Sequence, residues 1–216
     1  MSDRSSDIEY SEIIFKRLRN YFGKIECPLY FTKDYELAVA AILSDQCTDE
    51  RVNSVTKELF EKYPTLDSFA KANLGDLEEL IFPTGFFRDK AKLIKSIAQK
   101  ILSDYNGKLP DTLIELTSLP GIDRKTANML LNEVFNRSEG ISVDAHVKRI
   151  SNKLGLTTEN LPENIEYDLM EKVDKKYWLR FSLYLTYLGR KHCKANRTEC
   201  ENCPLNDICP SSNLIK

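Results

Sequence analysis

Apolar residues recur at helical spacing along almost the whole chain. In the first such segment, Ile8, Phe15 and Leu18 fall on one stripe and predict a helix over 8–22. Only 141–143, with the sequence ISV, resembles a short strand. The same periodicity predicts further helices over 35–43, 49–62, 66–72, 75–82, 88–105, 111–117, 124–136, 145–154, 163–172 and 176–190. The pattern is typical of an all-α protein built from short helices.

Turn-forming residues separate many of these helices. Pro64, Pro83, Pro110 and the pair Pro120-Gly121 stand between predicted segments, where they end one helix and open the next. The chain has no internal repeat, low-complexity tract or flexible linker. A domain boundary must therefore fall between packed helices.

Composition sets outer limits on function. The chain has 216 residues, of which 42% are hydrophobic and 30% charged, enough for one large domain or two small ones. A net charge of -2 and a pI near 5.9 give no bulk signal for nucleic acid, so a DNA-binding face would have to be a local basic patch. The start, MSDRSSDIEY, lacks an apolar signal core, and the apolar segment 36–43 is too short to span a bilayer. We expect a cytoplasmic protein.

Four of the six cysteines crowd into one stretch near the C-terminal end, with the spacing Cys193-x6-Cys200-x2-Cys203-x5-Cys209. In a cytosolic chain such crowding favours metal ligation over disulfides. Four thiolates suit either zinc or an iron-sulfur cluster. Zinc sites typically use two close pairs, whereas only Cys200 and Cys203 form such a pair, so the spacing favours a [4Fe-4S] cluster with one thiolate per iron.

A second unusual stretch is SLPGIDRKTANMLL, residues 118–131, where two adjacent cations stand at the start of a predicted helix. The N-terminal end of a helix carries partial positive charge, so Arg124 and Lys125 are electrostatically unfavourable there. Their placement indicates a function that needs positive charge at this point.

These motifs together resemble the endonuclease III family, helix-hairpin-helix DNA glycosylases of base-excision repair. The cysteine spacing follows LPGIDRKTA at 119–127 and SVDAHVKRI at 142–150. Upstream, LAVAAILSDQCTDERVN at 37–53 and GFFRDKA at 85–91 extend the resemblance over nearly the whole chain. The joint order and spacing of the motifs carry the assignment.

The resemblance implies a two-domain, all-α architecture. One domain is expected to be a six-helix barrel over 25–138, with the helix-hairpin-helix motif at about 111–136. The other is expected to combine 1–24 with 139–216 and to hold the cluster, and the active site would lie in the cleft between them.

The resemblance also assigns catalytic roles. Lys125 matches the nucleophile whose amine attacks the sugar C1′ and forms a Schiff base, and the helix N-terminus and Arg124 both disfavour its ammonium form. Asp144 matches the carboxylate that stabilises positive charge developing on the sugar, and it is also a natural N-cap. Its neighbour His146 is a candidate DNA contact, with a packed histidine as an equal alternative.

The hairpin turn departs from the family pattern. Backbone N-H groups of a Gly-x-Gly turn bind phosphate in such motifs, but here Asp123 replaces the second glycine after Gly121. Asp tolerates positive φ, so we expect the turn to survive. Its carboxylate predicts weaker or more cation-dependent DNA binding, while Arg124 is a candidate phosphate contact.

Two positions match residues that fill the gap left by an extruded base. These are Gln46 in SDQCTD and Phe86 in GFFRDKA, where the family commonly has Leu. Lys194 and Arg197 lie in the loop after the first cluster cysteine, which touches the DNA backbone in the family. They belong to a basic stretch, GRKHCKANR at 189–197.

The resemblance implies a monomeric, bifunctional glycosylase and abasic-site lyase acting on oxidised pyrimidines, such as thymine glycol, in double-stranded DNA. Its [4Fe-4S] cluster would organise a binding loop and take no part in the chemistry. Two alternatives stay open: a monofunctional relative, for example of the adenine-mismatch type, which Lys125 disfavours, and a non-catalytic DNA-damage binder or cluster-based redox sensor. The lesion spectrum and opposite-base preference are not fixed by these motifs.

Overall fold

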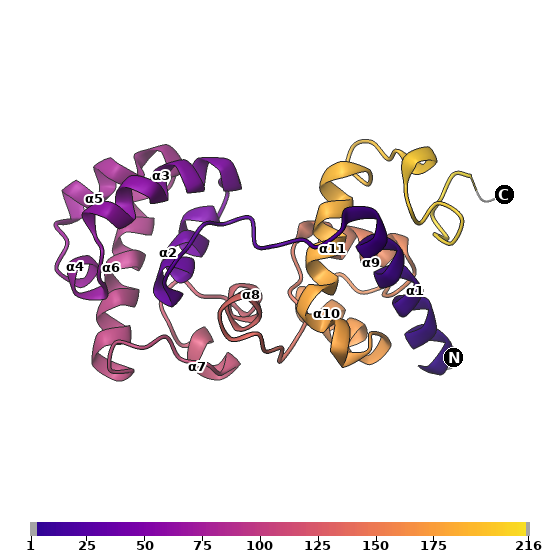
Figure 1. Ribbon diagram of the computed structural model, residues 1–216, viewed down its shortest axis with the longest axis horizontal. Helices are drawn as coiled ribbons and strands as arrows, with labels where there is room; N and C mark the ends of the chain where they lie inside the picture. Colours follow the sequence, from indigo (N-terminus) through magenta and orange to yellow (C-terminus); the bar gives the residue numbers. More distant parts are fainter. Residues whose placement is uncertain (1–3, 215–216) are drawn as a thin grey trace. The chain divides into compact units, whose positions relative to one another are not determined.

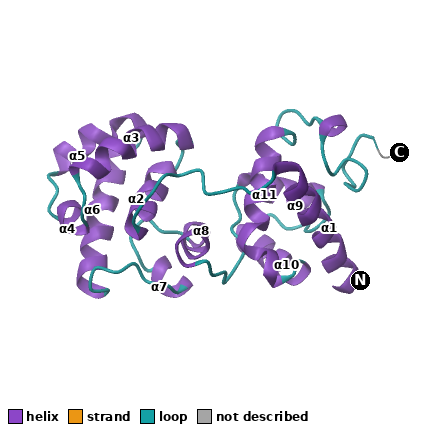
Figure 2. Ribbon diagram, in the orientation of Figure 1, coloured by secondary structure: helices purple, strands orange, loops and turns teal. Residues whose placement is uncertain are grey.

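The computed structural model describes residues 4–214, and its regular secondary structure in that range is all helical, as predicted (Figure 2). No strand forms among these residues, so the expectation for 141–143 is wrong. That segment has no neighbouring strand to pair with, and Ile141 and Val143 are instead buried in an apolar core. None of the helices in the described part of the chain is long and apolar enough to cross a membrane.

The chain divides into two compact units. Residues 27–135 form one, called here the central unit, and residues up to 26 together with those from 136 form the other, the terminal unit. The predicted boundaries at 25 and 138 lie close to these divisions.

The central unit contains seven α-helices and a short 3-10 helix, all within residues 27–135 (Figure 1). The α6 helix packs against α2, α4 and α5, and α8 packs against α2 and α7. One continuous apolar core fills the space between them. The elements are α2 (Asp34–Ser44), α3 (Asp49–Lys62), α4 (Leu66–Ala70), α5 (Leu74–Ile81), η1 (Phe82–Thr84), α6 (Phe87–Asp104), α7 (Leu113–Thr117) and α8 (Arg124–Phe135).

The terminal unit is built from both ends of the chain. The α11 helix packs against α1 and α9, and α10 packs against α1 and α9. Long-range hydrogen bonds join the two chain segments. The Tyr184 hydroxyl donates to the carbonyl of Gly23 (2.8 Å), and the Tyr10 hydroxyl donates to the carbonyl of Ile208 (3.1 Å). Its elements are α1 (Arg4–Phe22), α9 (Ala145–Lys153), α10 (Pro162–Lys172), η2 (Lys175–Tyr177), α11 (Trp178–Lys191) and η3 (Cys200–Asn202).

Side-chain caps fix where several helices begin. Thr48, Thr65, Asn73 and Thr112 each accept a hydrogen bond from a backbone N-H in the first turn of the helix that follows. The helix predicted over 111–117 therefore starts two residues later, since Thr112 lies outside it as the cap. These caps satisfy N-H groups that have no partner within the helix.

Candidate active site

A glycine in the turn between α7 and α8 allows the backbone there to lie close to α2 and α6. Gly121 has φ +78°, a conformation that favours glycine. A Cβ at this position would lie 3.3 Å from side-chain carbons of both Ile42 and Leu93, in α2 and α6. The turn thus approaches these two helices too closely for a larger residue without movement of its neighbours.

Asp123 does not use the left-handed conformation that Asp tolerates. Its Oδ1 instead accepts a hydrogen bond from the backbone N-H of Thr126 (2.7 Å), which makes Asp123 the N-cap of α8. Positive φ is not needed here because α8 begins at the next residue, and an N-cap normally has extended backbone. Only Gly121 supplies the positive φ of this turn.

Lys125 lies in the first turn of α8 with 48% of its side chain exposed. Its Nζ is 4.0 Å from Oδ2 of Asp123, so the capping residue also forms an ion pair with the lysine. Such an exposed pair adds little stability, but it keeps the amine beside the hairpin turn. Arg124, directly before it, is also exposed. The amine is open to a large ligand approaching the hairpin.

Gln46 and Phe86 share an unusual backbone conformation. Gln46 has φ +52° after the end of α2, and Phe86 has φ +48° at the start of α6. Left-handed backbone is uncommon in such residues and strained for a bulky side chain. Both side chains are exposed, Phe86 to 61%. Strained backbone of this kind concentrates at functional sites.

Lys90 was missed from the sequence and is 3% exposed. Its Nζ donates three hydrogen bonds, to the carbonyls of Leu43 (2.8 Å), Asp45 (2.7 Å) and Thr84 (2.9 Å). Burial lowers the pKa of Lys90, and the nearby Cys47 and Asp45 oppose that shift. A signal did exist in the sequence: Lys90 lies on the apolar stripe of α6, whose other members include Ala91, Ile94, Ile97 and Ile101.

Asp144 caps α9 in the terminal unit, as its sequence context predicts. Its Oδ1 accepts a hydrogen bond from the backbone N-H of Val147 (2.7 Å), and its Oδ2 lies 3.1 Å from the hydroxyl of Thr186 in α11. Each carboxylate oxygen thus has a partner from a different helix. The carboxylate is half-buried and held in one orientation.

His146 is half-buried in the gap between α9 and α11. Its Nδ1 lies 3.1 Å from Nη2 of Arg149, and a Cβ at Gly189 would come within 2.6 Å of the same nitrogen. Burial lowers the pKa of His146, while Asp144 raises it and Arg149 and Arg190 lower it further. The sequence offered two interpretations of His146, a DNA contact and a packed histidine, and this position corresponds to the second.

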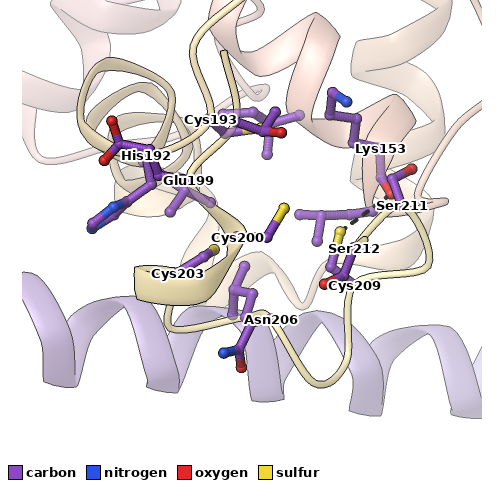
Figure 3. Close-up of a pocket in the computed structure, with 15 residues that line it drawn as sticks. Lys153, His192, Cys193, Glu199, Cys200, Cys203, Asn206, Cys209, Ser211 and Ser212 are labelled. Atoms are coloured by element: carbon purple, nitrogen blue, oxygen red, sulfur yellow. Dashed lines mark hydrogen bonds between the residues drawn. The ribbon is translucent and has the colours of Figure 1, made fainter. Parts of the chain in front are cut away.

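The four clustered cysteines line one pocket of the terminal unit, which also contains the side chains of Ile150, Leu154, Leu188 and Leu205 (Figure 3). Burial raises the pKa of Cys193 and Cys209, and that of Cys203 to about 11. Free thiolates are therefore disfavoured there, and a bound cationic group would be needed to keep them deprotonated.

The donor set of this pocket fits a [4Fe-4S] cluster, because four cysteine side chains line it. A zinc ion needs its ligands to meet at one point, whereas a [4Fe-4S] group takes one thiolate per iron and requires them to surround a larger volume. Four sulfurs around an apolar pocket match the second requirement.

The loop after Cys193 exposes its basic residues. Lys194 and Arg197 are both solvent-exposed, and Nε of Arg197 lies 3.7 Å from Oε1 of Glu199. The loop is anchored where it begins, since Nε and Nη2 of Arg149 both donate to the carbonyl of Cys193, at 3.1 and 2.7 Å. This pair of bonds links the loop to α9, the helix that Asp144 caps.

Comparison with known proteins gives consistent matches. Residues 39–175 match the model described as "HhH-GPD superfamily base excision DNA repair protein". Endonuclease III of Synechocystis sp. is 44% identical over 195 residues, covering 90% of this chain and 89% of the relative, and endonuclease III of Bacillus subtilis is 38% identical over 204 residues, covering 94% and 93%. A solved structure of a trapped endonuclease III-DNA covalent intermediate, an estranged-adenine complex, is 35% identical, with a TM-score of 0.88 over 98% of this chain and 97% of that one. The predicted resemblance and fold class are confirmed.

Proposed function

Because the chain belongs to the endonuclease III family of the HhH-GPD superfamily, we propose that it removes oxidised pyrimidines, such as thymine glycol, from double-stranded DNA. It is a base-excision DNA glycosylase and abasic-site lyase. The lesion class comes from the family resemblance. We propose further that it acts as a monomer.

The observation that carries the proposal is the exposed amine of Lys125 in the first turn of α8. In the solved structure that resembles this chain over 98% of its length, endonuclease III is trapped in a covalent intermediate with DNA. A lysine amine is the group able to form such an intermediate with a sugar carbon and then to support strand cleavage.

In this mechanism the uncharged Nζ of Lys125 attacks C1′ of the damaged nucleotide. The bond from C1′ to the base breaks, and the base leaves with the bonding electrons and takes up a proton. The new C1′-N bond becomes a Schiff base as the sugar ring opens. Loss of a proton from C2′ then breaks the C3′-O bond, and the strand is cleaved by β-elimination.

Asp144 is proposed to stabilise positive charge that develops on the sugar as the base leaves. Its two hydrogen bonds, from Val147 N-H and Thr186 Oγ1, support this role because they fix the orientation of the carboxylate. The presence of Lys125 and Asp144 together argues against a purely DNA-binding function and against a monofunctional relative.

DNA is proposed to contact both units. In the central unit, the Gly121 turn and Arg124 would bind backbone phosphate, and Gln46 and Phe86 would occupy the gap left by the extruded base. In the terminal unit, Lys194 and Arg197 would contact the backbone electrostatically.

We propose that Cys193, Cys200, Cys203 and Cys209 hold a [4Fe-4S] cluster. When bound, this group would fix the fold of the loop around it and take no part in base removal. Loss of the four-thiolate site would then weaken DNA binding through the loop that carries Lys194 and Arg197.

Borohydride trapping tests the proposal. The protein is incubated with a duplex carrying one thymine glycol, and reduction of a Schiff base leaves a permanent protein-DNA adduct. We expect an adduct with the native protein and with Lys71→Gln, a matched exposed lysine that pairs with Asp67, and at least about a thousandfold less with Lys125→Gln. No adduct from native protein that still shows cluster absorbance near 400 nm would overturn the proposed substrate or the lysine mechanism.

A further inference from the structure

The turn that follows α2 and the turn that precedes α6 meet at one buried ammonium group, that of Lys90. Each of its three N-H groups donates a hydrogen bond to a different backbone carbonyl. Two of those carbonyls, of Leu43 and Asp45, belong to the end of α2, and the third, of Thr84, belongs to the turn before α6.

The charge of Lys90 suits its position. The C-terminal end of a helix carries unpaired carbonyls and partial negative charge, so a cation is favoured at the end of α2. An apolar side chain could fill the same volume, but it would leave three buried or half-buried carbonyls without this partner. The lysine therefore serves the two backbone segments rather than the core alone.

Each of these segments leads directly into a left-handed, exposed residue. Gln46 follows Asp45, and Phe86 lies two residues after Thr84 and accepts a hydrogen bond at its carbonyl from the Lys90 backbone N-H (3.1 Å). Arg51, in α3, adds a longer bond from its Nη1 to Pro83 O, at 3.5 Å. With bonds of 2.7 to 2.9 Å to both segments, the Lys90 ammonium ties them together directly.

We propose that Lys90 is a positioning residue for gap filling, whose buried ammonium fixes together the two turns that carry Gln46 and Phe86. Both side chains are then oriented before DNA binds, so little freedom remains to be lost when they enter the duplex. The inference rests on the gap-filling role proposed above for Gln46 and Phe86.

The test measures lesion selectivity. Binding is compared for a duplex with one tetrahydrofuran abasic-site analogue and for the matching undamaged duplex, and the ratio of the two affinities is recorded. An unfolded fraction of a variant lowers both affinities equally and leaves the ratio unchanged. We expect Lys90→Met to lower the ratio by about tenfold. Lys95→Met is the control, because Lys95 lies on the same helix and donates to one carbonyl, of Ala72.

A mutant cycle separates positioning from general destabilisation. If Lys90 acts through the two exposed residues, Lys90→Met should have almost no further effect on the ratio in a Gln46→Ala, Phe86→Ala background. If Lys90→Met does not yield folded protein, Lys90→Gln, which keeps one amide donor, takes its place in the same cycle.

The outcomes distinguish this inference from the proposed function. An unchanged ratio for Lys90→Met, with a reduced ratio for Gln46→Ala or Phe86→Ala, overturns the role of Lys90 and leaves gap filling intact. An undiminished effect in the double-variant background overturns it as well, because Lys90 would then act elsewhere. Unchanged ratios for both alanine variants overturn the gap-filling role and this inference with it.

Discussion

The central and terminal units hold their proposed functional residues in different ways. In the central unit, Gln46, Phe86 and Lys125 stand at turns fixed by a continuous apolar core, a buried lysine and a helix cap. In the terminal unit, the segment from 192 to 214 has only one 3-10 helix, and four cysteines line the pocket it encloses. The central site is therefore organised by the fold itself, whereas the cysteine loop is proposed to be organised by the cluster that its cysteines hold.

Removal of one proposed cluster ligand should show the difference in stability between the two units most clearly. Cys203→Ala is expected to abolish absorbance near 400 nm and to destabilise the terminal unit by several kcal/mol, because metal binding contributes directly to folding of such loops. The central unit should keep its own melting transition, measured by circular dichroism.

Cys27→Ser is the matched control, since Cys27 lies outside the loop and packs partly against the core of the central unit. It should keep both the absorbance and the terminal unit's transition. A single unchanged transition in Cys203→Ala would contradict the contrast between the units.

The next largest effect is expected at Asp144, where capping and catalysis can be separated. Asn is as good an N-cap as Asp, so Asp144→Asn should keep stability but lower the rate of base removal by about a hundredfold through loss of the negative charge. Asp144→Ala should lose that rate and also about 1 kcal/mol of stability. Single-turnover kinetics and urea unfolding measure the two effects, and equal rates for native protein and Asp144→Asn would exclude the electrostatic role.

A smaller effect is expected at the hairpin turn. Asp123→Gly removes a carboxylate from the proposed phosphate site, and Gly at an N-cap costs only a few tenths of a kcal/mol. DNA affinity should rise by several fold at low salt and by less at high salt. Asp123→Asn keeps the cap without the charge and should raise DNA affinity in the same way as Asp123→Gly. If both variants bind DNA with the same affinity as the native protein at every salt concentration, repulsion by Asp123 is ruled out.

The smallest effect concerns His146. Its pKa is lowered by burial, so the unfolded chain binds a proton more readily than the folded protein. Stability contributed by the neutral ring is complete above the ordinary pKa of 6.5 and is lost as pH falls below it, toward the lowered folded value. His146→Gln should remove this part of the pH dependence of unfolding free energy, and a native-minus-variant difference that is flat from pH 7 to about 5 would refute it.

Much of the fold follows from local pattern in the sequence. The stripe in each amphipathic segment predicts its helix, and Asp144 stands at the N-cap where its context places it. The capping role of Asp123 was missed because the residue was compared with the second glycine of a Gly-x-Gly turn and was not considered as the residue before a helix. Periodicity places Lys90 on the apolar stripe of α6, but its carbonyl partners in α2 depend on packing between residues distant in sequence, which periodicity does not encode. The same holds for the bond from Thr186 to Asp144.

The discontinuous terminal unit has a consequence for synthesis. The helix α1 leaves the ribosome before the central unit, yet its packing partners α10 and α11 and its hydrogen-bond acceptor Ile208 are made after that unit. The whole of residues 27–135 emerges in between and can fold while translation continues. At about 5 to 20 residues per second, α1 waits on the order of ten seconds or more for its partners. Insertion of the proposed cluster would then follow synthesis of Cys209, when both segments of the terminal unit can come together.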